Sequence, residues 1–210
     1  FGLGDRTGID TTHERRGVLP SRAWKEATLG QVWFPGETVN VGIGQGHMLA
    51  TPMQLALASA VLASRGVRHQ PRLLLAVDGE PVPTVEPTLV EAPPANWELV
   101  HEAMWAVLHG ERGSARAVGK GSTYQMAGKS GTAQVVGIAQ DDIYREDELL
   151  EKHRDHGLFI AFAPYDQPRI AVAVVVENGG GGSKVAAPIA RQVMDSYLLD
   201  GELPQVAGNE

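Results

Sequence analysis

The stretch Gly128-Lys129-Ser130-Gly131-Thr132-Ala133-Gln134 lies inside residues 124–137, which have the composition of a β-strand. Its middle carries a lysine and two hydroxyl side chains at positions where a buried strand would carry apolar residues. Such departures from a local sequence rule tend to mark functional sites. Because side chains alternate along a strand, the lysine is expected on one face and the two hydroxyls on the other. The stretch therefore predicts a strand that carries chemistry as well as structure.

The glycine at position 131 indicates that another backbone could pair with this strand. A residue without a side chain lets another backbone approach closely, as happens when an extended peptide adds to the edge of a sheet. We therefore expect an edge strand, with Lys129 and the neighbouring hydroxyls binding the anionic end of a peptide. An ordinary exposed strand, in which Lys, Ser and Thr are common, fits the same pattern.

Strands and helices alternate in the second half of the chain. Two further strands are expected over residues 158–163 and 169–177, and a glycine-rich loop then leads into a helix over residues 184–199. Asn96, a good N-cap, predicts another helix over residues 96–110. Late strands flanked by helices indicate a mainly antiparallel sheet covered by helices, an α/β fold of the α+β type, without internal repeats.

The helix expected over residues 51–66 has the strongest start signal. Thr51 can cap it, Pro52 suits its first turn, and Gln54 stands at the third position of a capping box. The residues that follow are mostly apolar, so we expect this helix to be buried as part of the scaffold.

The first 50 residues lack a sustained hydrophobic period and contain many glycines and prolines. We expect residues 1–50 to form an irregular segment that wraps around the domain and is docked by Trp24, Trp33 and Phe34. The segment ends in Val41-Gly42-Ile43-Gly44-Gln45-Gly46. Its alternate glycines indicate either backbone that lies close to another segment or a turn-rich connector.

Three other segments have weaker patterns. The proline-rich residues 70–95 predict a surface excursion or a hairpin, in which residues 73–77 are the best strand candidate. Residues 114–118 predict one short turn of helix. The charged residues 141–156 predict a solvent-exposed helix between the first two strands.

Composition excludes several classes of function. The chain has 18 Lys and Arg against 25 Asp and Glu in 210 residues, and its net charge of −7 argues against a nucleic-acid-binding protein. It has no cysteine, which excludes disulfides, thiolate metal sites and cysteine nucleophiles. The apolar runs are too short to span a bilayer, and the opening residues do not resemble a signal peptide. The chain starts without methionine, and we expect it to be a piece of a longer protein.

Nucleotide and metal sites are alternatives from other classes. A phosphate-binding P-loop would need a glycine where Thr123 stands, and a helix rather than a strand after the lysine. Residues 41–46 miss the dinucleotide-binding fingerprint, because their third glycine comes one position early. Four residues that could ligate zinc lie close together in the sequence: Glu151, His153, Asp155 and His156. They lie among arginines and lysines, as on a solvent-exposed face. We expect neither a metal nor a cofactor.

Several motifs in the chain resemble one protein family. Lys129-Ser130-Gly131-Thr132 is similar to the Lys-Thr/Ser-Gly signature of penicillin-binding proteins and serine β-lactamases. The stretch 41–46, followed by Thr51-Pro52, is typical of class B penicillin-binding proteins. The order of the motifs along nearly the whole chain resembles the class B transpeptidases of rod elongation in Gram-negative bacteria. The remaining matches are Phe162-Ala163-Pro164-Tyr165, Glu177-Asn178-Gly179-Gly180 and Ala187-Pro188-Ile189-Ala190.

The resemblance implies that residues 1–210 are the C-terminal part of one transpeptidase domain, with the active-site strand and the strands after it in residues 124–177. In this family a serine attacks the penultimate D-Ala carbonyl of a peptidoglycan stem peptide. The terminal D-Ala leaves, and an amine from a second stem peptide resolves the acyl-serine. β-Lactams mimic the D-Ala-D-Ala end and acylate the same serine.

The resemblance also assigns roles to four residues. Lys129 would keep the site electropositive and assist proton transfer through a neighbouring serine. Ser130 and Thr132 would hydrogen-bond the substrate carboxylate, and the Thr132 N–H would form half of the oxyanion hole. Gly131 would leave room for the substrate along the strand.

The catalytic nucleophile of the family is missing from this sequence. None of the eight serines is followed by lysine three positions later, or by Asn or Asp two positions later. We therefore expect half an active site that needs the N-terminal part of the same domain and is inactive alone. A non-catalytic module that binds peptides or partners is the alternative. The resemblance further implies a lipid-linked glycan polymerase and other elongation-complex proteins as partners, and a location at the periplasmic face of the inner membrane.

Overall fold

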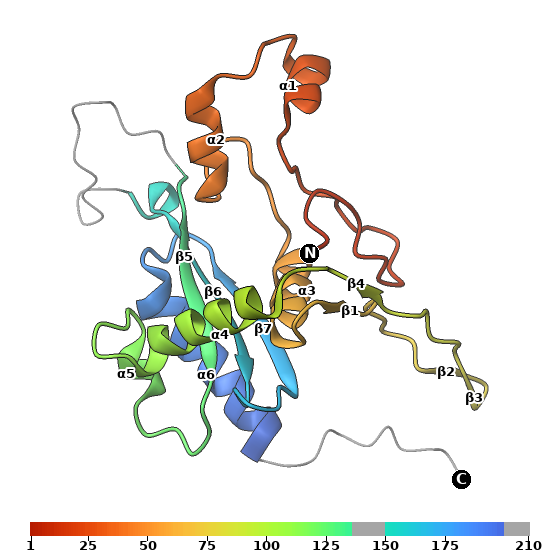
Figure 1. The fold of residues 1–210 in the computed structure, drawn as a ribbon, viewed down its shortest axis with the longest axis vertical. Helices are drawn as coiled ribbons and strands as arrows, with labels where there is room; N and C mark the ends of the chain where they lie inside the picture. Colours follow the sequence, from red (N-terminus) through yellow and green to blue (C-terminus); the bar gives the residue numbers. More distant parts are fainter. Residues whose placement is uncertain (136–149, 200–210) are drawn as a thin grey trace.

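The computed structural model describes residues 1–135 and 150–199, and its centre is a three-stranded antiparallel sheet (Figure 1). The strands are β5 (Ala127–Ala133), β6 (His156–Ala163) and β7 (Ile170–Val176), in the order β5-β6-β7. β5 pairs with β6 along its whole length. In the part of the chain that the structure describes, β5 therefore lies at the edge of this sheet, as the sequence predicts.

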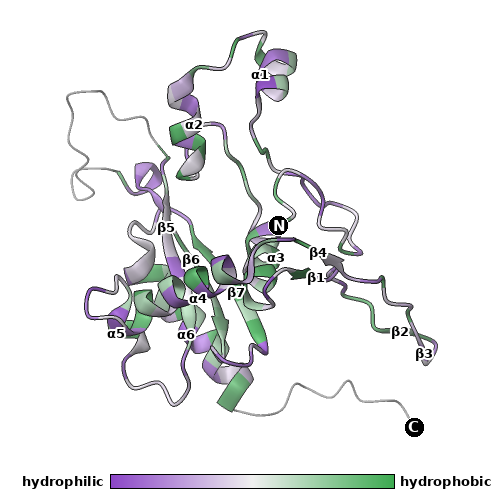
Figure 2. Ribbon diagram, in the orientation of Figure 1, coloured by the Kyte–Doolittle hydropathy of each residue, from purple (hydrophilic) through white to green (hydrophobic). Residues whose placement is uncertain are grey.

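Helices cover both faces of the sheet, and the alternation of side chains along β6 decides which helix covers which face. Phe159 is buried against α6 (Gly182–Leu199). Phe162, on the opposite face, is buried against α3 (Pro52–Ala63) and α4 (Pro94–His109). Figure 1 shows α4 crossing one side of the sheet and α6 lying on the other, and Figure 2 shows hydrophobic residues along α3 and β7. The expected fold class is confirmed.

The start of α3 follows the sequence prediction. Thr51 Oγ1 accepts a hydrogen bond from the Gln54 N–H (3.1 Å), and Gln54 Oε1 accepts one from the Thr51 N–H (2.9 Å), which completes the capping box. Gln54 Nε2 also donates to the carbonyl oxygens of Asp5 (2.7 Å) and Arg16 (2.6 Å). One fully buried side chain therefore starts the helix and fixes the N-terminal segment against it.

Replacement of Gln54 by leucine should lower the free energy of unfolding by about 2 kcal/mol, because one arm of the capping box is lost and several carbonyl oxygens of the N-terminal segment lose their donor. Thr51→Ala, which removes only one arm of the capping box, should cost about 1 kcal/mol. Urea denaturation of the two variants measures the difference. Equal losses would show that the bonds from Gln54 to the N-terminal segment contribute nothing to stability.

Two helices begin earlier than the sequence predicts. α4 starts at Pro94, so the expected N-cap at Asn96 is wrong, and Asn96 lies inside the first turn. Proline suits that start because its φ is already helical and the first turn leaves an N–H without a partner. α6 starts at Gly182 instead of at Lys184. A short helix, α5 (Arg116–Gly119), follows α4 close to its expected position.

The expectation of an irregular segment over residues 1–50 is wrong for two helices, α1 (Arg22–Leu29) and α2 (Pro35–Gly42). Ser21 Oγ caps α1 by accepting from the Trp24 N–H (3.1 Å), and proline occupies the first position of α2. Both helices have eight residues and bury almost nothing: only Lys25 is buried on α1, and α2 buries no residue. At this length they are shorter than the window over which an apolar helical period is recognised in a sequence.

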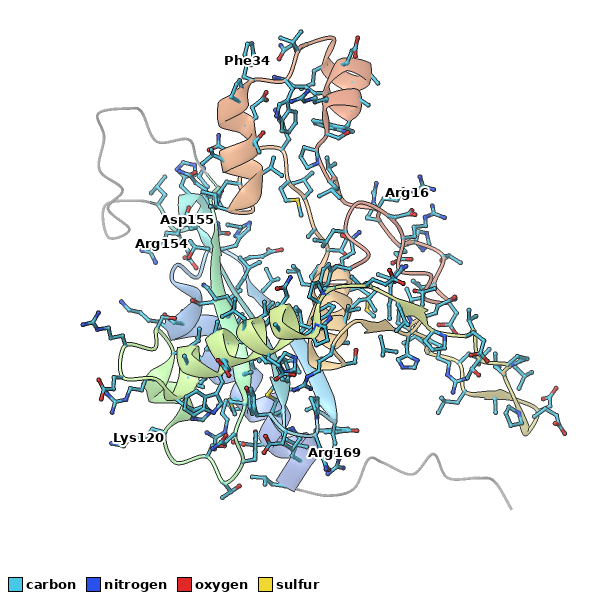
Figure 3. The ribbon with its side chains drawn as sticks, in the orientation of Figure 1. Arg16, Phe34, Lys120, Arg154, Asp155 and Arg169 are labelled. Atoms are coloured by element: carbon cyan, nitrogen blue, oxygen red, sulfur yellow. The ribbon has the colours of Figure 1, made fainter. Side chains whose placement is uncertain are left out.

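The aromatic residues of this segment do not dock it onto the domain in the expected way. Phe34 is 58% exposed, and Figure 3 shows it at the outer end of the segment. The Trp33 Nε1–H donates to Thr38 Oγ1 (2.9 Å), and the Trp24 ring lies 5.4 Å from the His47 ring. These contacts hold the segment together internally.

Residues 67–89 form two small antiparallel pairs. β1 (Val67–Arg68) pairs with β4 (Thr88–Leu89), and β2 (Ala76–Val77) pairs with β3 (Glu80–Pro81) in a hairpin that projects from the molecule (Figure 1). The predicted hairpin is thus present. Of the strand candidate 73–77, only the last two residues form a strand.

Part of the predicted solvent-exposed helix, residues 141–149, lies outside the described residues. Of the remainder, Glu151–His153 form a short 3₁₀ helix and His156 begins β6, so the helix is not found there. Within residues 1–135 and 150–199, no helix has both the length and the apolar character needed to cross a bilayer.

Candidate active site

The four predicted site residues lie together on β5, opposite Leu158–Ile160 and their neighbours on β6. Lys129 and Thr132 are exposed, and Ser130 and Gly131 are half-buried. The Lys129 ammonium donates to the carbonyl oxygen of Ser130 at 2.6 Å, so the cation stays beside the strand. The edge of β5 therefore presents a positive charge and two hydroxyls within four consecutive residues.

The two glycines of β5 have different roles. A Cβ atom on Gly128 would come within 2.8 Å of the Phe159 ring and of the Ile160 carbonyl oxygen, so the core requires a glycine there. A Cβ atom on Gly131 would lie 3.4 Å from the Leu158 Cβ, which is an ordinary contact. The described fold therefore has room for a side chain at Gly131 and does not itself require a glycine there. This leaves the expected reason for the glycine, which is space for a substrate along the strand.

The start of α6 supports the site strand from behind. A Cβ atom on Gly182 would lie 2.5 Å from the Gly131 carbonyl oxygen and would collide with the Leu158 carbonyl oxygen. Near the other end of the strand, the Tyr124 hydroxyl donates to Asp195 Oδ1 on α6 (2.7 Å). The pKa of Tyr124 is raised, first by burial and then by this bond to a carboxylate. Both ends of β5 are thus fixed to one helix.

Sequence reasoning missed two residues that reach the site strand from distant parts of the chain. Gln45 Nε2 donates to the Thr132 carbonyl oxygen at 3.0 Å, across 87 positions of sequence. Ser114 Oγ lies 3.4 Å from Ser130 Oγ. The glycines around Gln45 were the available signal for the first contact, and no local pattern marks the second.

The alternate glycines of residues 41–46 do not act by close packing. A Cβ atom on Gly42 or Gly44 would meet no atom within 4 Å, so the expectation of a close backbone approach is wrong there. Gly44 and Gly46 instead have φ values of 76° and 72°, which L-residues with side chains rarely adopt. The expected alternative, a turn, is what these glycines form.

The start of β6 is held by a polar cluster that includes the candidate zinc ligands Asp155 and His156. The Asn178 N–H donates to His156 Nδ1 (2.9 Å), and the Gly180 N–H donates to the Asp155 carbonyl oxygen (2.8 Å). Figure 3 shows Asp155 beside Arg154 at the end of β5. Within the described ranges, no three His, Asp or Glu residues converge as a metal site requires. The cluster joins the loop after β7 to β6.

Residues 1–195 match the family described as the penicillin-binding protein transpeptidase domain. The chain is 41% identical over 211 residues to the peptidoglycan D,D-transpeptidase MrdA of Haemophilus influenzae. The match covers 98% of this chain and 32% of that protein, so the chain spans about a third of the length of this curated relative.

Solved structures with the same fold are also similar in sequence. The crystal structure of Pseudomonas aeruginosa PBP2 in complex with WCK 5153 matches 96% of this chain and 42% of that chain, with a TM-score of 0.83 and 49% identity. A structure described as the structural coordination of polymerization and crosslinking by a peptidoglycan synthase complex matches 97% of this chain and 32% of that chain. Its TM-score is 0.74 at 35% identity.

Proposed function

The chain belongs to the penicillin-binding protein transpeptidase family, and we propose that it forms the C-terminal part of the active site of a peptidoglycan D,D-transpeptidase. The observation that carries the proposal is the open edge of β5. There, four consecutive residues, Lys129-Ser130-Gly131-Thr132, supply a cation, two hydroxyls and main-chain groups. An extended peptide with an anionic end, such as the D-Ala-D-Ala end of a stem peptide, fits that edge.

Lys129 and the two hydroxyls bind the charged end of the substrate. The chain has a net charge of −7, so an exposed ammonium at the strand edge supplies the local positive charge that a carboxylate needs. The hydroxyls of Ser130 and Thr132 donate hydrogen bonds to that carboxylate. β-Lactams carry a carboxylate too and bind at the same edge.

The Thr132 main chain stabilises the reaction intermediate. In an antiparallel ladder, the N–H and C=O of one residue project toward the same side of the strand. The Thr132 carbonyl oxygen is reached by Gln45 from outside the sheet, and the Thr132 N–H therefore faces the open edge as well. As the attacked carbonyl becomes tetrahedral, its oxygen gains negative charge and accepts a hydrogen bond from this N–H.

The nucleophile comes from outside residues 1–210, because none of the eight serines has the spacing of the family motif. That serine attacks the penultimate D-Ala carbonyl carbon, and the terminal D-Ala leaves as an amine that takes up a proton. The amine of a second stem peptide then attacks the acyl-serine and releases the serine. Lys129, near the attacking serine, assists these proton transfers.

We propose three further features of the parent protein. It acts at the periplasmic face of the inner membrane, where peptidoglycan is crosslinked. The N-terminal part of the same domain is its first partner, since the open edge of β5 provides only half of a site. A glycan polymerase of the elongation machinery is the second, and the similar structure of a complex that coordinates polymerization and crosslinking supports this choice.

Mass spectrometry of the penicillin-treated parent protein tests the proposal. After denaturation and digestion, we expect one acylated serine that lies outside residues 1–210. All eight serines of this chain should stay unmodified. Acylation at any of those eight, or no acylation of an intact parent protein, would overturn the proposed role.

A further inference from the structure

Residues 19–48 form an arm that leaves the domain and returns to its starting point. Its base is an antiparallel bridge, in which the Val18 N–H donates to the Leu49 carbonyl oxygen (2.7 Å) and the Leu49 N–H donates back (3.0 Å). Between these residues the chain carries α1 and α2, which Figure 1 shows extending away from the core beyond the upper end of β5. We call residues 19–48 the α1–α2 arm.

The α1–α2 arm is held together by a buried charge. Lys25, which is 3% exposed, donates to Glu37 Oε2 at 2.7 Å and lies 4.7 Å from the centre of the Phe34 ring. Glu37 also accepts from the Phe34 N–H (2.7 Å). The pKa of Glu37 is lowered, first by the bond from Lys25 and then by the Phe34 N–H. The helices of the arm therefore have a fixed relation although they share no apolar core.

The turn after α2 presents Gln45 to the sheet. The Gly44 N–H donates to the Val41 carbonyl oxygen (3.0 Å), and the Gln45 N–H donates to the Asn40 carbonyl oxygen (2.8 Å). Left-handed φ values on both sides, at Gly44 and Gly46, let the chain reverse direction within a few residues. Gln45 is half-buried, whereas Gly44 and Gly46 are exposed.

From this geometry we propose that Gln45 is a positioning residue for the acyl-transfer site, which holds the Thr132 peptide group in its working orientation. Its Nε2 donates to the Thr132 carbonyl oxygen at 3.0 Å. That bond restrains the backbone torsions of the residue whose N–H and hydroxyl face the substrate. Thr132 lies near the end of β5, one residue before the strand stops, where the ladder alone restrains it least.

The chemistry of the side chain suits this role. An amide donates a hydrogen bond without bringing charge into a site that binds a carboxylate through Lys129. A glutamate at the same position could not donate and would repel both the carbonyl oxygen and the substrate. The inference rests on the proposed function, because it assigns Gln45 a role in the same reaction.

The test uses the parent protein and separates binding of a penicillin from acylation. For Gln45→Leu we expect the first-order acylation rate constant to fall about tenfold, since a small misplacement of a reacting group slows chemistry strongly. The dissociation constant of the noncovalent complex should change less than about threefold, because the charge contacts of Lys129 remain. Gln45→Glu, which keeps the length but loses the donor, should slow acylation at least as much, and its negative charge should in addition weaken binding of the anionic penicillin.

Gln31→Leu is the matched control, because Gln31 is an exposed glutamine on the same arm. It should acylate as the unmodified protein does. If Gln45→Leu and Gln45→Glu also acylate normally, the inference about Gln45 fails while the proposed function stands. If both variants lose binding and acylation to the same extent, Gln45 is structural only and the inference is overturned. The same holds if both unfold at so much lower a temperature than Gln31→Leu that partial unfolding accounts for the lost acylation. Absence of acylation in the unmodified protein would instead overturn the proposed function.

Discussion

Replacement of Lys129 by methionine in the parent protein should lower the rate of acylation by a penicillin by about 10²- to 10³-fold. Methionine keeps much of the length and the apolar stem of lysine but has no charge and no donor. The variant loses the positive charge at the β5 edge and the group that assists proton transfer. Because Lys129 is exposed and its ammonium donates to the carbonyl oxygen of the neighbouring Ser130, the sheet should remain folded without it.

Lys120→Met is the matched control for this substitution. Lys120 is an exposed lysine at the end of α5, and it lies away from the β5 edge in Figure 3. Stopped-flow acylation with a fluorescent penicillin should show a normal rate for Lys120→Met. A normal rate for Lys129→Met as well would mean that the cation at the strand edge takes no part in the reaction.

The second large expected effect is a loss of stability where the start of α6 packs against β5 and β6. Gly182→Ala should lower the free energy of unfolding by about 3 kcal/mol, because the new methyl group collides with the carbonyl oxygens of Leu158 and Gly131. These are backbone atoms of two paired strands and cannot rotate away as a flexible side chain would. The start of α6 must therefore move away from the sheet. Thermal unfolding should show a decrease in Tm of roughly 6–12 °C.

Gly131→Ala provides the comparison on the facing strand. Its methyl group would make an ordinary contact of 3.4 Å with Leu158 Cβ, and stability should change by less than about 0.5 kcal/mol. If the two variants unfold at the same temperature, α6 does not approach the β5–β6 pair as closely as the structure places it.

The sequence predicted the scaffold well where the residues that interact are neighbours in the chain. Thr51 and Gln54 mark the start of α3, because both arms of a capping box lie within four residues. The candidate site on β5 was also marked by a local signal, because a lysine and two hydroxyl residues stand where a buried strand would carry apolar residues. The role of those residues in catalysis stays a prediction.

The features that sequence reasoning missed depend on contacts without a local period. α1 and α2 have eight residues each and bury one residue between them, so both are too short for a sustained apolar period to mark them. The bond from Gln45 to Thr132 joins residues 87 positions apart, and only the folded chain brings them together. At Asn96 a good cap residue was present, but Pro94 started the helix first, so one capping signal outweighed another.

The most direct test of the account is a crystal structure of the parent protein acylated by a penicillin. We predict that the antibiotic carboxylate will lie within hydrogen-bonding distance of the hydroxyls of Ser130 and Thr132. The oxygen of the acyl-serine carbonyl should accept a hydrogen bond from the Thr132 N–H, with Lys129 beside the site. An acyl group bound away from the β5 edge, with these three residues free of contact to it, would contradict the assignment of β5 as half of the active site.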